Sequence, residues 1–309
     1  MPGIGKLYLG SVAGSSIVVS AEAHEASCRL AEGIASVLGL PEAESSLSSY
    51  WSLGIRKAQW EALVSLLPSG QAGGLRYVEI GCGFGLFVAV GCKLGFDCVG
   101  VEAAADSYGG SVDIAKEFFR TNGLDPNSIR CGAAESLSFN DASVDVICAY
   151  QTIEHVENPE AMIREIFRVL APGGLALLTC PNYLYPYEAH YGLALPLPLG
   201  RWVTRFVLRR RHKPVGFLDT LNWITPSKMR TWLTRAGFHQ FEITPERCAG
   251  REIPSFNVVS APLSYRFLRG EAEFVKAGNL MARRGIRTWA SWREVYPQIH
   301  CIAWKPKCC

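Results

Sequence analysis

The sequence predicts an α/β protein, with a mostly parallel sheet that carries helices on both of its faces. From Tyr77 onward, short apolar segments of strand length alternate with amphipathic segments of helix length, and this order is typical of right-handed β–α–β units. A turn rich in glycine follows the first predicted strand, as it does where the edge of a parallel sheet binds a nucleotide. Of the 309 residues, 49% are hydrophobic, which is enough to build one such core with additions to it.

Residues 1–75 are expected to form a helical cover that precedes the sheet. The segments 21–38 and 51–67 have helical patterns, and a link rich in proline and serine separates them. The apolar segment 7–19 faintly resembles a signal peptide, but glycine and serine interrupt it. No apolar run approaches the ~20 residues that a membrane-spanning helix needs. We therefore expect neither a leader nor a membrane-spanning helix.

Five strands and three helices make up the predicted centre of the domain. The last of these helices has the clearest signals, because Asn158 can cap its first turn and Pro159 suits its first position. Apolar residues at helical spacing then line one face, and the Pro-Gly-Gly run at 172–174 ends the helix. The predicted strands lie near residues 77–80, 97–101, 129–131, 144–149 and 175–180, and the predicted helices near residues 84–94, 110–122 and 159–170.

The regular alternation stops after the fifth strand. Residues 181–225 are rich in tyrosine, proline, leucine and arginine, and one more helical segment follows them. Two strand-like segments, 239–244 and 298–304, are separated by residues 245–297. We therefore predict one domain over residues 76–309 that carries insertions at 181–225 and 245–297. Additions of this kind usually decide which substrate a shared fold accepts.

The glycine-rich turn is the most informative motif of the chain. Gly81, Gly83 and Gly85 alternate with other residues directly after a predicted strand, and Glu79 precedes them by two residues. Glycine is required where the backbone turns sharply or approaches a ligand, because a Cβ atom would clash. Nicotinamide dehydrogenases favour G-x-G-x-x-G, whereas here the third glycine comes one residue early and Leu86 takes its place. A dehydrogenase is therefore the less favoured alternative.

The next predicted strand ends in an acid, Glu102. It comes about twenty residues after the glycine turn, where a carboxylate can accept hydrogen bonds from both hydroxyl groups of a ribose. The competing interpretation is a solvated acid at the end of a strand. Together with the glycine turn, this acid predicts a nucleoside site at the carboxyl edge of the sheet.

Four ordered segments carry a resemblance to a known family. They are Glu79-x-Gly81-x-Gly83-x-Gly85 with Glu102, residues 132–139 with 144–147, Ile153-Glu154-His155-Val156-Glu157-Asn158-Pro159, and residues 165–174. They resemble the class I S-adenosylmethionine-dependent methyltransferases, small-molecule branch, and are similar to ubiquinone-biosynthesis and related O-methyltransferases. The resemblance implies a Rossmann-like sheet of seven mostly parallel strands, whose last two strands form an antiparallel hairpin at the edge. It also implies that the protein is an enzyme.

The cofactor implied by the resemblance is S-adenosyl-L-methionine, with S-adenosyl-L-homocysteine as its product. The glycines would let backbone amides approach the methionine end, Glu102 would hold the ribose, and Ala134 would contact adenine through its backbone. Members of the family often carry aspartate at the place of Ala133, so a side-chain contact to the adenine amino group is not expected here. The residues expected to bind the cofactor are Glu79, Gly81, Cys82, Gly83, Gly85, Glu102, Ala103, Ala134, Glu135 and Gln151.

Glu154 and His155 are the candidate catalytic residues. They follow the fourth strand, at the edge where the methyl group is delivered, and a histidine there can act as a general base near neutral pH. The alternative is that both residues only tie down the start of the next helix. Ubiquinone-biosynthesis relatives can use E-x-x-E-H to hold a divalent ion, but the neutral Gln151 replaces the first acid here. We therefore expect no metal.

The first insertion supplies the candidate substrate-binding residues, which are Tyr183, Tyr185, His190, Trp202 and Arg211. Aromatic side chains just after the fifth strand can wall a pocket and face the sulfonium cation. The segment 201–213 places arginines at four-residue spacing beside an apolar side. This segment predicts peripheral contact with an anionic membrane, a site for an acidic substrate group, or a solvated basic helix packed on the domain. The last of these interpretations is favoured.

These observations predict transfer of a methyl group to a small, sugar-linked or lipid-linked acceptor, with an oxygen as the first choice of acceptor atom. A nitrogen or carbon acceptor, or a binding protein without catalysis, are the alternatives. No nucleic-acid partner is expected, because Tyr150-Gln151-Thr152 stands where base-methylating relatives carry an (N/D)PPY-like motif. Eleven cysteines without any C-x-x-C pair favour a reducing, cytoplasmic location. The sequence leaves the oligomeric state open.

Overall fold

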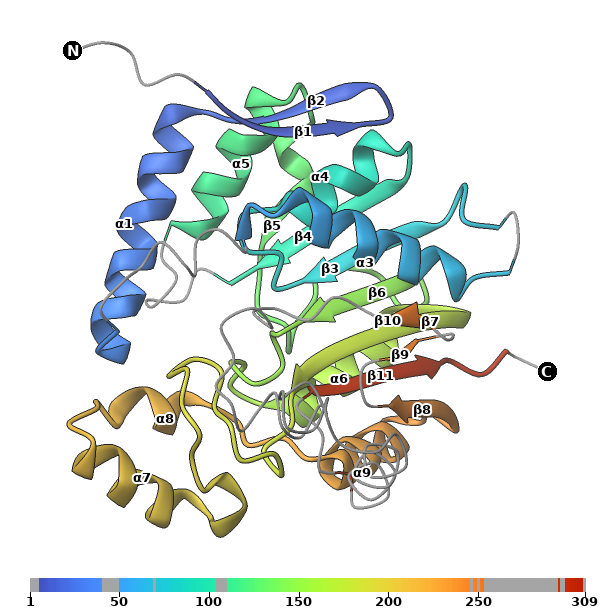
Figure 1. The fold of residues 1–309 in the computed structure, drawn as a ribbon. Helices are drawn as coiled ribbons and strands as arrows, with labels where there is room; N and C mark the ends of the chain where they lie inside the picture. Colours follow the sequence, from blue (N-terminus) through green and yellow to red (C-terminus); the bar gives the residue numbers. More distant parts are fainter. Residues whose placement is uncertain are drawn as a thin grey trace, which may run out of the picture.

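A seven-stranded sheet forms the centre of the protein (Figure 1). The structure is a computed structural model that describes residues 6–40, 50–68, 71–103, 110–244, 247–248, 251–252, 294 and 298–307. The strands follow the order β5-β4-β3-β6-β7-β11-β8, and all pairs from β5 to β7 are parallel. The strands are β3 (Arg76–Ile80), β4 (Asp97–Glu102), β5 (Ile129–Cys131), β6 (Val144–Tyr150), β7 (Leu170–Pro181), β8 (Gln240–Thr244) and β11 (Gln298–Trp304).

This arrangement confirms the predicted Rossmann-like fold class. The last strand, β11, runs antiparallel to both β7 and β8 and lies between them, as the resemblance implied for the edge of the sheet. The chain leaves β3 toward β4 and β5 on one side, and later returns through β6 and β7 on the other. The strand order therefore reverses where β3 and β6 lie side by side. Ligands of open α/β sheets bind at such a reversal, outside the carboxyl ends of the strands.

Helices cover both faces of the sheet, so its central strands are buried on both sides. Alternate residues of each strand point to opposite faces, and two separate apolar clusters form there. The helices α3 (Leu53–Ser65), α4 (Leu86–Lys93) and α5 (Ser111–Thr121) pack on one face. The helices α6 (Pro159–Val169) and α9 (Pro226–Ala236) pack on the other.

Helix α6 begins and ends close to where its sequence predicts, and the Pro-Gly-Gly run that follows it is part of the next strand. The side chain of Asn158 accepts a hydrogen bond from the Ala161 backbone N–H at 3.0 Å, and Pro159 occupies the first turn. The helix ends at Val169, within one residue of the predicted end, and residues 172–174 belong to β7. The Gly173 N–H donates to the Lys305 carbonyl oxygen at 2.9 Å, so the glycines continue the pairing with the end of β11.

The N-terminal cover is not helical throughout, which corrects the prediction for residues 1–75. Its first described elements are β1 (Leu7–Val12) and β2 (Ser15–Val19), which pair as an antiparallel hairpin. Ala13 and Gly14 at the turn both have positive φ angles, of 45° and 78°, as a tight two-residue hairpin turn requires. The predicted helices are confirmed as α1 (Ala21–Leu38) and α3.

The first insertion follows β7 and builds a small apolar cluster of its own. It contains a short 3-10 helix, η3 (Leu197–Leu199), and the helices α7 (Arg201–Arg210) and α8 (Gly216–Thr220). Leu208 of α7 and Leu218 of α8 are fully buried in this cluster together with Leu38 at the end of α1. The insertion therefore bridges from the carboxyl edge of the sheet to the N-terminal cover.

The second insertion, 245–297, lies outside the described residues except for the two-residue strands β9 (Arg247–Cys248) and β10 (Arg251–Glu252) and for Glu294. Among the helices that the structure describes, none combines the length and the apolar character needed to cross a membrane.

The hairpin depends on one buried amide, which gives a test of the fold. The Asn122 side chain accepts a hydrogen bond from the Val18 N–H at 2.9 Å and donates to the carbonyl oxygens of Val18 and Phe118 at 2.8 and 2.7 Å. Asn122→Ala should lower the free energy of unfolding by about 1–3 kcal/mol, because buried backbone groups lose their partner. Urea denaturation measures this change. The exposed Asn127→Ala is the matched control, and equal losses in both variants would contradict the role of Asn122.

Candidate active site

The glycine turn after β3 is held in a left-handed backbone, and its three glycines serve different purposes. Gly81, Gly83 and Gly85 have φ angles of 72°, 53° and 78°. A Cβ atom on Gly81 would lie 2.3 Å from the Thr152 side chain, and one on Gly85 would press against side chains of α5 and β5. Among the described residues, a Cβ atom on Gly83 would meet only the Tyr50 ring, at 3.8 Å. Gly83 is therefore the glycine of this turn whose backbone a ligand can approach.

Glu102 ends β4 beside this turn, as predicted. Its carboxylate Oε2 accepts a hydrogen bond from the Gly83 N–H at 2.6 Å, and the residue is only 9% exposed. The Gly81 and Cys82 N–H groups donate to the carbonyl oxygen of Val101, so the turn is also fixed to the strand that carries Glu102. Burial raises the pKa of Glu102 to about 7, against the opposing effect of the Gly83 hydrogen bond. The acid and the glycine turn thus form one unit at the point where the strand order reverses.

Glu79 contributes a second buried carboxyl group to the same edge. Burial raises its pKa to about 8, although nearby Arg56 of α3 acts in the opposite direction. Its Oε2 atom has no hydrogen-bond partner within the described part of the chain. A buried carboxyl oxygen without a partner is costly, and a ligand donor would satisfy it. This orphaned oxygen and the open backbone at Gly83 fit the amino acid and nucleoside groups of S-adenosylmethionine.

The other residues predicted to bind the cofactor have varied surroundings. Ala134 is buried, whereas Ala103 is exposed at the end of a described stretch. Glu135 accepts a hydrogen bond from the Asn158 N–H at 3.0 Å, which anchors the start of α6. Gln151 has a positive φ of 55°, rare for a residue with a side chain, and its N–H donates to the Thr179 carbonyl oxygen. Such backbone strain is concentrated at functional sites.

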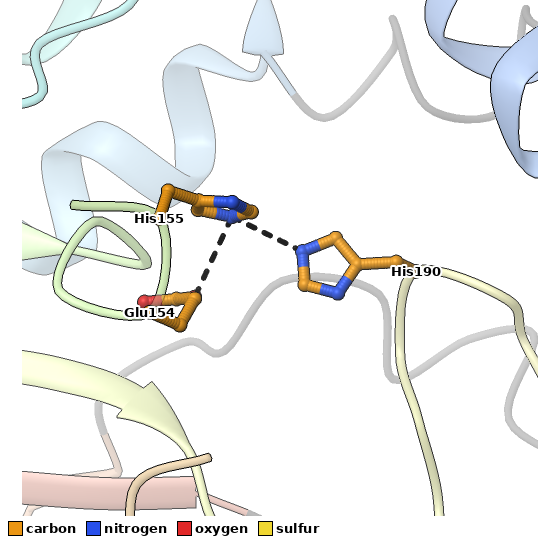
Figure 2. Close-up of side chains that lie close together, drawn as sticks. All are labelled: Glu154, His155 and His190. Atoms are coloured by element: carbon orange, nitrogen blue, oxygen red, sulfur yellow. Dashed lines mark hydrogen bonds and ion pairs between the residues drawn. The ribbon is translucent and has the colours of Figure 1, made fainter. Parts of the chain in front are cut away.

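Two histidines and a glutamate come together after β6 and β7 (Figure 2). The His155 Nε2 and His190 Nε2 atoms lie 3.2 Å apart, and the two rings are perpendicular. The His155 Nε2 atom also lies 3.9 Å from Glu154 Oε1. The sequence predicted Glu154 and His155 as a catalytic pair and His190 as a wall of the substrate pocket. The structure joins all three into one cluster, with His190 supplied by the first insertion.

Sequence reasoning missed the residue that orients His190. The Glu188 Oε1 atom lies 2.6 Å from His190 Nδ1, and Glu188 Oε2 accepts a hydrogen bond from the Tyr191 N–H at 2.9 Å. Glu188 is only 1% exposed. Its single sequence signal was an acid two residues from a histidine within an apolar insertion. Tyr50 and Arg56 were missed as well, because they lie in a helical pattern that indicates packing alone.

Charge is unevenly distributed over the histidine pair. Burial and the neighbouring His190 lower the pKa of His155 to about 3, so its imidazole is neutral at pH 7. Burial also acts to lower the pKa of His190, but Glu188 and Glu154 outweigh it and raise that pKa above its ordinary value. A proton between the two Nε2 atoms is therefore bound mainly to His190, whose Nδ1 atom lies beside the Glu188 carboxylate.

Glu154 is the least satisfied group of the cluster. Its side chain is fully buried, burial raises its pKa to about 7, and neither of its oxygens accepts a hydrogen bond from a described residue. One donor atom each from Glu154, His155 and His190 lie within 4.8 Å of one another, which would allow a shared cation. We expected no metal because Gln151 replaces the first acid of the E-x-x-E-H motif. That motif does not include His190 as a further nitrogen ligand. The absence of a metal stays a prediction.

The remaining substrate-binding candidates divide into two groups. Tyr183 and Tyr185 are buried, and the Tyr183 ring stacks on Trp223 at 5.5 Å. Burial raises the pKa of Tyr183, and the carboxylates of the histidine cluster raise it further, which places its hydroxyl group near them. Trp202 and Arg211 instead face solvent on α7 and at its end. No interaction recorded for the described residues joins these two to the cluster.

Comparison with known proteins finds similarity in the central part of the chain. Residues 78–178 match a family model described as a methyltransferase domain. An uncharacterized methyltransferase of Mycobacterium sp. (strain KMS) is 31% identical over 158 residues, which cover 50% of this chain and 57% of the relative. A ubiquinone biosynthesis O-methyltransferase of Parvibaculum lavamentivorans is 30% identical over 171 residues, covering 55% of this chain and 61% of the relative. The chain thus spans less than two thirds of the length of these relatives.

One similar solved structure is described as a putative sarcosine dimethylglycine methyltransferase from Galdieria sulphuraria. Its TM-score is 0.48 at 14% identity, and the match covers 86% of this chain and 88% of that chain. That similarity is too low to support an argument. The family match confirms the resemblance predicted from the sequence. It identifies residues 78–178 as a methyltransferase domain, for which S-adenosylmethionine is the cofactor.

The ribose assignment of Glu102 can be tested by binding alone. Glu102→Ala should weaken S-adenosylhomocysteine binding at least about tenfold, or roughly 1.4 kcal/mol, because the ribose hydroxyls lose their acceptor. Titration calorimetry measures the affinity. Asp97→Ala removes the acid at the opposite, exposed end of the same strand and should bind like the wild type. Unchanged affinity in Glu102→Ala would show that the ribose lies elsewhere.

Proposed function

Because residues 78–178 form a methyltransferase domain, we propose that the chain transfers a methyl group from S-adenosylmethionine to a small, sugar-linked or lipid-linked acceptor, with an oxygen as the acceptor atom. The observation that carries the proposal is the hydrogen bond from Gly83 to Glu102 at the reversal of strand order. It brings the open backbone of the glycine turn next to the Glu102 carboxylate, which we assign to the ribose. The histidine cluster lies at the same carboxyl edge of the sheet, after β6 and β7.

The chain would hold the cofactor through few groups. Glu102 would accept hydrogen bonds from the ribose, the backbone around Gly83 would face the methionine end, and the unpartnered oxygen of Glu79 would accept a donor from the ligand. When bound, the cofactor supplies a methyl group already activated by a sulfonium centre. The protein therefore has mainly to position the acceptor and exclude water. The N-terminal cover supports this task, because the Tyr50 ring lies over Gly83.

An oxygen acceptor must also lose a proton, and the histidine pair can receive it. His155 is neutral, but with its pKa lowered to about 3 it is a weak base by itself. In the form of the pair that carries no positive charge, His190, 3.2 Å away, gives the proton a second position, and the buried carboxylate of Glu188 stabilises the positive charge that results. Groups this close titrate as a unit rather than separately. We therefore assign the base to the pair, with Glu188 as its positioning residue.

The alternative acceptors make different demands on these residues. A neutral amine can accept the methyl group before it loses a proton, so a nitrogen acceptor would depend less on the pair. A carbon acceptor would need a base at a different distance from the sulfur. A binding protein without catalysis would retain the need for Glu102 but not for the pair. The buried link from Glu188 through His190 to His155 favours the oxygen acceptor.

The walls of the acceptor pocket remain part of the proposal. Tyr183 and Tyr185 come from the first insertion, and the Tyr183 hydroxyl is buried without a partner among the described residues. An acceptor that reaches the cluster could satisfy this hydroxyl group. Nothing in this environment calls for a nucleic acid, and we propose a small-molecule, glycan or lipid-linked partner.

The coupling of the two histidines predicts a specific titration. In the wild type, the His155 signal in an NMR titration should not move between about pH 5 and 8, because its folded pKa is lowered to about 3. His190→Gln removes the neighbouring positive charge, so the pKa of His155 should rise above its wild-type value, while burial, the larger cause, still holds it below the ordinary value of about 6.5. The exposed His239→Gln is the control and should leave His155 unchanged. A wild-type His155 that titrates near its ordinary pKa of about 6.5 would contradict the coupling.

His155 and His190 should also determine kcat for methyl transfer. Once an acceptor has been found by transfer of labelled methyl groups to hydroxyl-bearing compounds, His155→Ala should lower kcat by about 100-fold or more. His190→Gln should lower kcat and change its pH dependence while leaving S-adenosylhomocysteine affinity within about twofold. Full activity in both variants would remove the pair from the reaction and favour a nitrogen or carbon acceptor.

The expectation of no metal has a direct measurement. Elemental analysis of the purified protein should find no stoichiometric divalent ion, and a chelator should leave methyl transfer unchanged. Two histidine nitrogens and a carboxylate are also a donor set for zinc, so the result decides between two uses of the cluster. One bound ion per chain that is lost in both Glu154→Gln and His190→Gln would overturn the metal-free proposal.

A further inference from the structure

Helix α7 turns its aromatic side chains toward solvent. Trp202 is 79% exposed and Phe206 is 51% exposed, and Leu199 in the preceding turn is 69% exposed. A spacing of four residues places Trp202 and Phe206 on one side of α7, and Leu199 lies in η3 just before the helix. The expected apolar side of this segment is therefore only partly used for packing. Figure 1 shows α7 beside α8 at the margin of the molecule, far from the helices that cover the sheet.

The packing of α7 is complete without these aromatic residues. Its inner side is formed by Thr204 and Leu208, which are both fully buried, and Leu208 belongs to the apolar cluster of the insertion. Arg201 donates to the Leu218 carbonyl oxygen at 2.7 Å, and Arg205 donates to Asp219 at 3.0 Å. These contacts fix the rotation of the helix against α8. The exposed side is thus presented by a rigid element.

The flank of this exposed side is strongly basic. Arg209, Arg210 and Arg211 are all exposed, and the Arg210 guanidinium lies 5.2 Å from the centre of the Phe206 ring. Six of the chain's 31 lysines and arginines lie between Arg201 and Lys213, and no acid occurs in 196–218. The rest of the chain then carries 25 lysines and arginines against 28 acids. The positive charge of the protein is therefore concentrated at this helix.

We propose that α7 docks the protein on a membrane surface that carries anionic lipid headgroups. Its solvent-facing side combines the two features of an interfacial helix, namely aromatic and aliphatic side chains that can enter the headgroup region and arginines that face anionic lipid. A nucleic acid would leave Leu199, Trp202 and Phe206 without an apolar partner. We name this surface, formed by Leu199, Trp202, Phe206, Arg209, Arg210 and Arg211, the α7 docking surface. The proposal does not depend on the reaction that the domain catalyses.

Vesicle sedimentation tests the proposal on the full chain. The protein should bind vesicles of phosphatidylcholine that contain about 30 mol% phosphatidylglycerol, and binding to phosphatidylcholine alone should be weaker by about tenfold or more. Raising the salt concentration to about 1 M shortens the screening length to about 3 Å and should release most of the bound protein. Equal binding to both kinds of vesicle, or binding to neither, would overturn the proposal.

Matched variants then locate the surface. Arg209→Glu combined with Arg210→Glu should lower the partition coefficient on anionic vesicles by about tenfold or more, and Trp202→Ala combined with Phe206→Ala should lower it by a similar factor. The controls are Tyr8→Ala on β1 and Arg164→Glu on α6, which remove an exposed aromatic ring and an exposed charge elsewhere. The controls should bind like the wild type. If all variants bind alike, the membrane contact is not made by α7.

Self-association is the competing use of the same surface. Sedimentation velocity without vesicles should show the same species for the wild type and for Trp202→Ala. A dimer in the wild type that dissociates in Trp202→Ala would assign the α7 docking surface to a second copy of the chain and overturn the membrane proposal. Circular dichroism checks that the variants are folded, as expected for side chains that make so few internal contacts.

Discussion

The hydrogen bond between the Gly83 N–H and the Glu102 carboxylate is the contact on which the ligand edge depends. It requires the turn after β3 to bring a backbone N–H to the end of β4, and the left-handed backbone at Gly81, Gly83 and Gly85 is what makes this approach feasible. Side-chain packing fills the space around Gly81 and Gly85, whereas Gly83 keeps an open side. This buried carboxyl group with a raised pKa has a donor on one oxygen, and in our proposal the ribose supplies donors to the group as well.

The histidine cluster follows a different principle, since it is assembled from segments that are far apart in the chain. Parallel strands end at a common edge, so the residues after β6 and those after β7 meet although an entire helix separates them. Within this cluster Glu188 compensates the charge of His190, while His155 stays neutral and Glu154 accepts no hydrogen bond from the part of the chain that the structure describes. Buried ionisable groups in such an arrangement cost stability, which is typical of functional sites. The first insertion is therefore more than a cover, because it supplies half of the candidate base.

The sequence was sufficient for the parts of the structure that depend on local patterns. The alternating strands and helices, the cap at Asn158 and the acid at the end of β4 follow from propensity and spacing, and the glycine turn follows from steric requirements. It was insufficient where contacts join distant segments. Nothing local indicates that His190 reaches His155, that Glu188 orients it, or that Asn122 holds the N-terminal hairpin. The hairpin itself had a signal in Ala13-Gly14, but glycine and serine interrupt the apolar run around it.

A crystal structure with S-adenosylhomocysteine tests the central claim most directly. The account predicts the ribose hydroxyls on the Glu102 carboxylate, the homocysteine backbone against Gly83 and near Glu79, and the sulfur directed toward the side of the cleft that carries His155. Electron density that shows the ligand elsewhere, with no room for a nucleoside between Glu102 and Gly83, would contradict it.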